Sequence, residues 1–204
     1  MGQGIKTVLN KPWIPGQTEE DLFSGATFEV PTAKVGLRVF FFVITALFLL
    51  FISSYRLRMG YADWVPVPKP WELWLNTAFL VLSSVFLQWA CGAAKQSVHK
   101  ATTAFYLGGI FTLAFLGGQL WVWRELVALG YYVESNPANS FFYLITAVHG
   151  LHLVGGLVAW LRTAYQLHRQ SDSERVRINL DMCAVYWHYL LVVWAVLFYM
   201  LLST

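Results

Sequence analysis

The sequence predicts an all-α integral membrane protein built as a bundle of five transmembrane helices. Of its 204 residues, 57% are hydrophobic and only 12% are charged, whereas charged residues make up about a quarter of a soluble domain. Five apolar stretches are each long enough to cross a hydrocarbon core of about 30 Å, which takes about 20 residues. These spans are predicted at residues 35–55, 71–94, 101–123, 140–162 and 180–202.

Residues 1–33, before the first span, form a polar N-terminal segment that contains Glu19, Glu20 and Asp21. The segment lacks the basic start and the short apolar run of a cleaved signal peptide, so we expect the first span to act as an uncleaved anchor. Connections between the spans are short, which favours antiparallel neighbours. Residues 34–204 are therefore expected to form one bundle without a second soluble domain.

The basic residues predict the orientation. With the N-terminus in the cytoplasm, ten of the 14 lysines and arginines lie inside and four lie outside. The positive-inside rule therefore places the N-terminus inside and the C-terminus outside, in a bacterial cytoplasmic membrane. The net charge of +3 follows from this bias, and no basic cluster alternates with aromatic residues, so nucleic acid is not an expected partner. Cys91 and Cys183 form no CxxC motif, so neither a disulfide nor a zinc site is expected.

The connections have their own signals. The loop before the second span is rich in proline and places Trp64, Trp71 and Trp74 where an interfacial aromatic belt belongs. Before the fourth span, Pro137 precedes Asn139 and Ser140, either of which is expected to cap the helix.

Each span carries one polar or small stripe that indicates a helix-packing face, because membrane helices associate through small residues and interhelical hydrogen bonds. In the fourth span, the stripe consists of residues spaced at helical intervals within the apolar run FFYLITAVHGLHLVGGLVAW, and Gly155 lies at the edge of the stripe. The stripes contain Thr77, Ser84, Gln88 and Cys91; Gly108, Thr112 and Gln119; Ile145, His149, His152, Gly156 and Ala159; and Asp181, Ala184, His188, Leu191 and Ala195.

His152 and His188 are predicted at nearly the same depth in the membrane, so the two rings can face each other. Three explanations are open: neutral histidines that pack the helices together, a proton relay, or a pair of haem ligands. The bulky neighbours of His188, including Trp187, crowd the slot that a haem needs, which favours packing.

No catalytic or metal-binding motif is present, and we expect no catalytic residue and no metal ligand on this chain. Asp181 is the acidic residue closest to a helix interior, near the inner membrane face, where His99 also lies. Asp181 is explained by the dipole at the start of the fifth helix or by proton collection.

Three stretches resemble subunit III of the haem-copper terminal oxidases, in the short five-helix bacterial form. FFYLITAVHGLHLVGGLVAW is similar to the HGLH-x-x-GG signature, VYWHYLLVVWAVLF to the YWHF-x-D-x-VW segment, and LWLNTAFLVLSSVFLQWA to a helix with Asn followed by Ser-Ser. The last match adds Asn76 and Ser83 to Ser84 as packing positions, and a weaker match covers GGQLWVWREL. The resemblance extends from about residue 35 to the end.

The resemblance implies an accessory subunit that binds no haem or copper itself. It would pack on the large catalytic subunit (subunit I) beside subunit II, bind phospholipid, and support a complex that reduces oxygen and pumps protons. Three membrane carboxylates of the family are absent: Arg38, Val122 and Leu191 stand at their positions. Buried carboxylates usually belong to proton pathways, so a scaffold is expected, with Arg38, His99 and Asp181 as inner-side proton or lipid contacts.

Three alternatives remain open from the sequence. The same fold accompanies nitric-oxide reductases, and only the partner distinguishes that case. A haem-b membrane anchor would use His152 and His188 as ligands. A small channel or transporter is disfavoured, because broken helices and rows of intramembrane charges are missing from the sequence.

Overall fold

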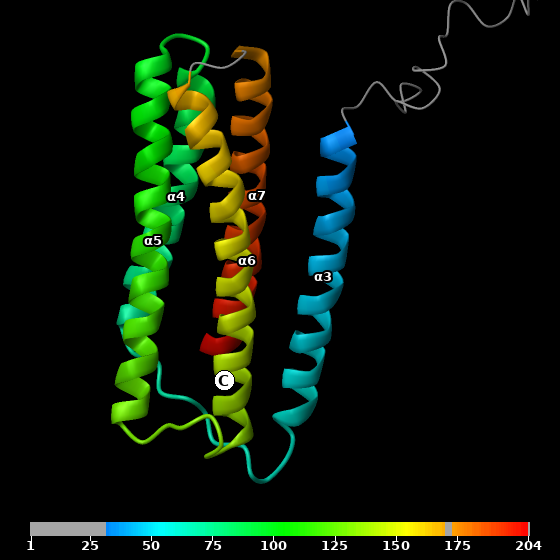
Figure 1. The fold of residues 1–204 in the computed structure, drawn as a ribbon. Helices are drawn as coiled ribbons and strands as arrows, with labels where there is room; N and C mark the ends of the chain where they lie inside the picture. The colour runs from blue at the N-terminus through cyan, green and yellow to red at the C-terminus, as the bar shows by residue number, and fades with distance from the viewer. Residues whose placement is uncertain (1–31, 170–172, 204) are drawn as a thin grey trace, which may run out of the picture. The chain divides into compact units, whose positions relative to one another are not determined.

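The computed structural model describes residues 32–169 and 173–203, and within these ranges all regular structure is helical. Each helix is long and apolar enough to cross a membrane. The predicted all-α class with five spans is therefore confirmed, and the helices extend beyond several predicted ends. Figure 1 shows them in order: α3 (Thr32–Arg58), α4 (Glu72–Ala93), α5 (Val98–Ala128), α6 (Pro137–His168) and α7 (Ser173–Leu202).

The chain divides into two compact units, residues 1–40 and 41–204. The predicted N-terminal segment, residues 1–33, lies outside the described residues except for the first two positions of α3. In the first unit the structure describes the opening turns of α3, where the Arg38 side chain is exposed. The second unit contains the rest of α3 and the four following helices.

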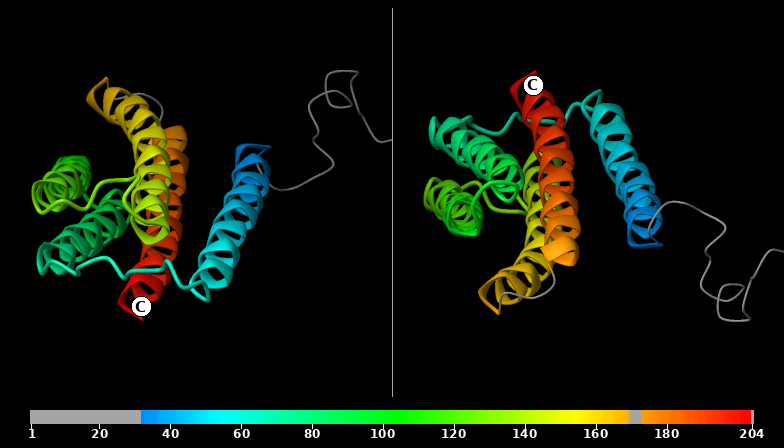
Figure 2. Two further views of the ribbon diagram at one scale, coloured as in Figure 1. Left: turned by 90° about the horizontal axis from the view of Figure 1, so that it is seen from below. Right: turned by 90° about the horizontal axis from the view of Figure 1, so that it is seen from above.

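In the second unit, α4 packs against α5 and α7, and α6 packs against the same two helices, so the four helices close a ring (Figures 1 and 2). The large side chains at the centre include Trp187 and Trp194, both completely buried. Helix α3 contacts this ring through long side chains rather than by close backbone approach. The Phe41 ring stacks on Tyr189 with 4.2 Å between centroids, and the Thr45 and Tyr189 hydroxyls are 2.8 Å apart.

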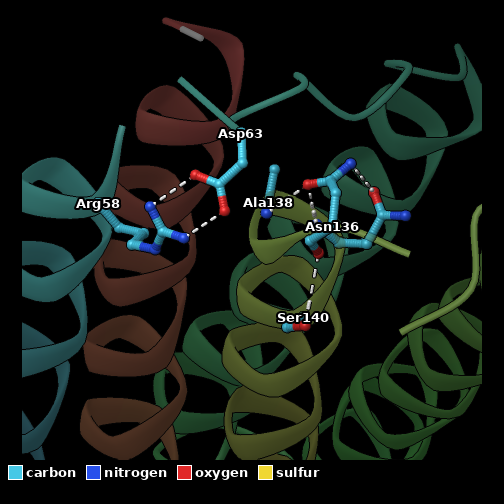
Figure 3. Close-up of polar contacts among 6 residues, drawn as sticks. Arg58, Asp63, Asn136, Ala138 and Ser140 are labelled. Atoms are coloured by element: carbon cyan, nitrogen blue, oxygen red, sulfur yellow. Dashed lines mark hydrogen bonds and ion pairs between the residues drawn. The ribbon is translucent and has the colours of Figure 1, made fainter. Parts of the chain in front are cut away.

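Two turn residues fix the connection between α5 and α6. Gly130 follows the end of α5 with φ +87°, a left-handed conformation that favours glycine. Asn136 begins α6: its side-chain oxygen accepts hydrogen bonds from the backbone N–H groups of Ala138 (2.6 Å) and Asn139 (3.4 Å), as Figure 3 shows for Ala138. The expectation that Asn139 or Ser140 caps this helix was wrong. Pro137 occupies the first helical position, where its missing N–H costs nothing, and this moves the cap to the preceding residue.

Replacing Asn136 by alanine is expected to lower the free energy of unfolding by about 1–2 kcal/mol, because two N–H groups lose their acceptor. Asn136 Nδ2 also donates to the Val65 carbonyl at 3.2 Å, tying the neighbouring loop to the cap. The aspartate variant keeps the cap oxygen and loses the Nδ2 group that donates to Val65 and to Asn139 Oδ1, so it should lie between wild type and alanine. Thermal unfolding of the purified chain in mild detergent measures the difference, and equal midpoints for alanine and wild type would contradict the assignment.

Candidate functional site

A buried polar ladder joins α4, α5 and α7 across the middle of the bundle. The Ser83 hydroxyl lies 2.7 Å from the Thr112 hydroxyl and donates to the Gly108 carbonyl at 2.8 Å. Trp187 Nε1 donates to the Thr112 hydroxyl at 2.8 Å. Gly108 permits this approach, because a Cβ there would lie 2.7 Å from Leu87 Cγ. The ladder satisfies polar groups that hydrocarbon cannot solvate.

The same three helices are also joined near the start of α4, by amide and hydroxyl groups. Asn76 Nδ2 donates to Gln119 Oε1 at 3.5 Å, and both side chains are buried. Trp194 Nε1 donates to the Thr77 hydroxyl at 3.0 Å. A Cβ at Gly118 would collide with the Asn76 amide, so this glycine makes room for the pair.

His149 lies completely buried within a cage of aromatic rings. The imidazole centroid is 5.2 Å from that of Trp194, 5.9 Å from Phe115 and 6.3 Å from Phe48. Neither ring nitrogen has a hydrogen-bond partner among the described residues. Van der Waals contact with the aromatic cage therefore holds the ring, and its polar atoms contribute no bond to the bundle.

Replacing His149 by leucine, which has a similar volume, is expected to leave the free energy of unfolding unchanged or raise it by about 1 kcal/mol. An unpaired buried polar group is a penalty that leucine removes. Thr112→Val is the matched control, because it strands the Trp187 N–H and should cost about 0.6–1.7 kcal/mol. Thermal unfolding in detergent compares the two, and a loss above 1 kcal/mol for the leucine variant would contradict the prediction.

His152 and His188 are held by different helices. His188 Nδ1 is 2.6 Å from the Ser84 hydroxyl of α4, and the imidazole is exposed. The half-buried His152 ring lies against Phe48 of α3 at 5.6 Å, with Nδ1 2.7 Å from the Val148 carbonyl of its own helix. These contacts correct the expected pairing with His188, because α4 is the neighbour that the ring of helices brings to this side of α7.

The two adjacent glycines of α6 have different surroundings. Gly156 is buried, and a Cβ there would lie 2.5 Å from Tyr186 Cε1 and 3.2 Å from Trp187 Cη2. Gly155 is exposed, with no atom within 4 Å of such a Cβ, and Ala159 is exposed as well. Gly156 therefore makes the close approach between α6 and α7 that the sequence assigned to the pair.

The partly buried carboxylates are not where the sequence placed them. Asp181 is exposed, whereas Glu72 and Glu125 are half-buried, each with an Oε2 atom that is buried and has no hydrogen-bond partner among the described residues. A signal for Glu72 existed, because it lies four residues before Asn76 and shares its helix face. At two of the positions where the resemblance expects a carboxylate, Val122 is completely buried and Leu191 is half-buried.

The loop after α3 carries an exposed ion pair, drawn in Figure 3. Arg58 Nη1 donates to Asp63 Oδ1 at 2.8 Å and Nη2 donates to Oδ2 at 2.5 Å. This bidentate contact lowers the pKa of the Asp63 carboxyl from its ordinary value. The pair therefore persists above that ordinary pKa and is lost when the pH falls through the lowered one.

A cavity of about 500 Å³ lies at the opposite end of α4, where its chain turns into α5. His99 and Lys100 supply basic groups, Gln96 and Thr103 supply hydrogen-bonding groups, and Trp89 supplies an aromatic wall. No acidic residue is among its lining residues. The cavity is completed by Gly92 and Ala93.

The described part of the chain contains no group of three or more His, Cys, Asp or Glu side chains arranged to hold a metal ion. Several buried polar residues, such as Ser83, Thr112 and Asn76, instead make contacts between helices. This arrangement can hold a bundle together and present its outer faces to lipid or protein.

Comparison with known proteins identifies the family. Residues 13–203 match the sequence profile of the family described as cytochrome c oxidase subunit III. The chain is 29% identical over 180 residues to cytochrome c oxidase subunit 3 of Thermostichus vulcanus, covering 85% of this chain and 88% of the relative. It is 29% identical over 125 residues to cytochrome bo(3) ubiquinol oxidase subunit 3 of Buchnera aphidicola, covering 61% of each chain. The subunit 3 of Gadus morhua cytochrome c oxidase is 26% identical, covering 87% and 74%. With nearly its whole length matched, this five-helix chain belongs to the cytochrome c oxidase subunit III family.

Proposed function

We propose that the chain is the non-catalytic accessory subunit of a haem-copper respiratory oxidase. The observation that carries the proposal is the family match over residues 13–203 together with a bundle whose polar side chains bond to one another. In this function the chain packs on the large catalytic subunit beside subunit II, and those subunits carry the haems and copper. Relatives are named for both cytochrome c and ubiquinol oxidases, so other subunits determine the electron donor.

Co-purification tests this function. The chain would be tagged at its C-terminus and extracted in mild detergent, and the accompanying proteins would be identified by mass spectrometry. Recovery of a large haem-copper subunit and a copper-binding companion is the expected result. Recovery of a nitric-oxide reductase would assign the chain to that complex, and recovery of the chain alone with bound haem would overturn the proposal.

The subunit acts chiefly as a scaffold rather than as part of a proton path. Arg38, Val122 and Leu191 replace the three carboxylates that the resemblance would place in the membrane, and Asp181 is exposed. Deletion of the chain should therefore reduce the assembly or the lifetime of the oxidase. Normal assembly with a large change in the initial rate of proton uptake would contradict this function.

The cavity between α4 and α5 binds the head group of an anionic phospholipid. Its basic side chains, His99 and Lys100, complement a phosphate, and Trp89 suits the membrane interface. The distribution of lysine and arginine supports an inside N-terminus, which puts this cavity on the cytoplasmic leaflet of a bacterial inner membrane.

Replacing Lys100 by glutamate is expected to reduce the phosphatidylglycerol that stays bound to the purified complex by several-fold, because like charges repel. Native mass spectrometry counts the bound lipids. Lys69→Glu, a charge reversal outside the lining of this cavity, is the matched control. Equal lipid retention by both variants would show that the cavity is not the lipid site.

A further inference from the structure

One stripe of the last helix, α7, is not covered by other helices of this chain, and it contains polar groups within the membrane span. Asp181, Val185, His188 and Val192 recur at helical spacing on α7, and all four are exposed. His188 is twelve residues from Val176, where the 27-residue span begins, and is therefore about 18 Å along the helix. An imidazole thus faces outward near the middle of the membrane.

Helix α4 borders this stripe with a polar group of its own. Ser84 contacts His188 and Thr77 contacts Trp194, which fixes how the two antiparallel helices lie alongside each other. Gln88 lies one turn from Ser84 on α4 and is exposed. We call this surface the α4–α7 face; it consists of Gln88, Asp181, Val185, His188 and Val192.

The exposed faces of the two other long helices of the ring are different. The large exposed side chains in the middle of α5 and α6 are apolar, as is usual for surfaces that contact lipid tails. They include Ile110, Leu113, Leu120, Leu144, Leu151, Val154, Val158 and Leu161. The α4–α7 face is therefore distinguished from its surroundings by hydrogen-bonding and acidic groups, not by apolar area.

Those groups are expensive against hydrocarbon. Polar side chains inside membranes almost always face protein or a water-filled cavity. His188 uses Nδ1 for Ser84, while Nε2 has no partner among the described residues. Two of the four stripe residues, Asp181 and His188, are polar, and polar side chains are used to pack helices together in membranes, yet all four are exposed in this chain.

We propose that the α4–α7 face is the docking site for a transmembrane helix of the catalytic subunit, a partner that rests on the function proposed above. That helix presents a hydrogen-bonding group to His188 Nε2 at mid-membrane depth. Nearer the end of α7 that contains Val176, it presents a basic or hydrogen-donating group to the Asp181 carboxylate. Val185 and Val192 supply the apolar contacts between these two polar points.

Photocrosslinking in the intact oxidase tests the face. A benzoylphenylalanine would be introduced at Val185 or Val192, with matched variants at Leu113 of α5 and Val158 of α6, and native membranes would be irradiated. Crosslinks to the large catalytic subunit from Val185 and Val192, but not from the two controls, are expected. Crosslinks to that subunit only from the controls, to a second copy of this chain, or only to lipid would overturn the proposal.

A substitution series tests the role of the imidazole. His188→Leu should increase several-fold the fraction of the chain that detergent washing removes from the catalytic subunit, whereas His188→Gln, which keeps a hydrogen-bonding group, should stay bound. Thermal unfolding of the separated chain is the control for a general loss of stability. Equal retention of leucine variant and wild type would overturn the role of His188. If tagged wild-type chain recovers no catalytic subunit, both this inference and the proposed function fail; recovery with crosslinks elsewhere removes only the inference.

Discussion

Replacing Gly156 by valine is expected to lower the free energy of unfolding by about 3 kcal/mol, the upper part of the range for overpacking a close-fitting interior. A Cβ at this position already lies 2.5 Å from the Tyr186 ring and 3.2 Å from Trp187. Neither ring can move freely: the Tyr186 hydroxyl donates to the His152 carbonyl at 2.8 Å, and Trp187 donates to Thr112. The added methyl groups must therefore separate α6 from α7 or break these hydrogen bonds.

Gly155 provides the matched control, because it is the adjacent glycine of the same helix and has open space around its Cα. Gly155→Val should leave the free energy of unfolding of the isolated chain within about 0.5 kcal/mol of wild type, as for ordinary surface substitutions. Thermal unfolding in mild detergent and the amount of chain in membranes are the two measurements. Similar losses of stability for both valine variants would show that valine destabilises α6 at either position and that the contact with Tyr186 is not the cause.

This pair of glycines shows how far the sequence could define the packing. The helical period of 3.6 residues located a polar and small stripe on α6, and the structure places His149 and Gly156 inside. Adjacent residues, however, differ by about 100° around a helix. The period therefore places Gly156 on the stripe and Gly155 at its edge, but it does not predict that Gly156 meets Tyr186 and Trp187, because that depends on which rings of α7 approach the helix.

The neighbour of His188 could not be predicted for a related reason. Depth along the helices predicts which residues lie at comparable levels, but it does not give the order of the helices around the bundle. The structure places α4 beside the exposed side of α7, so Ser84 contacts His188, whereas His152 lies against Phe48 of α3. The polar stripe of the second span supplied Ser84 as a packing position without supplying its partner.

The predictions for the start of α6 and for the half-buried acidic residues were wrong for different reasons. Pro137 at the first helical position is a local signal, so the cap at Asn136 could have been predicted from sequence. A local signal also exists for Glu72, which shares a helix face with Asn76, whereas the partial burial of Glu125 depends on which side chains pack against α5.

Replacing Trp160 by alanine is expected to have the largest effect on the contact between α5 and α6. Trp160 stacks on Phe105 with 5.4 Å between centroids, and its Nε1 donates to the Phe105 carbonyl at 3.1 Å. The indole also fills the space that Gly109 leaves, since a Cβ there would collide with it. Truncating a buried tryptophan to alanine costs about 3–5 kcal/mol, and this ring is only 8% exposed.

Two further variants separate packing from hydrogen bonding at this position. Trp160→Phe keeps an aromatic ring and loses the N–H donor, so it should cost less than alanine; the hydrogen bond itself contributes about 0.6 kcal/mol on the scale of membrane proteins. Trp121→Ala, at a tryptophan of α5 that is 68% exposed, is the control for removing an indole outside the interface. It should leave the unfolding midpoint in detergent nearly unchanged. If Trp121→Ala destabilised the chain as much as Trp160→Ala, the packing of Trp160 against Gly109 would not be the contact that stabilises α5 against α6.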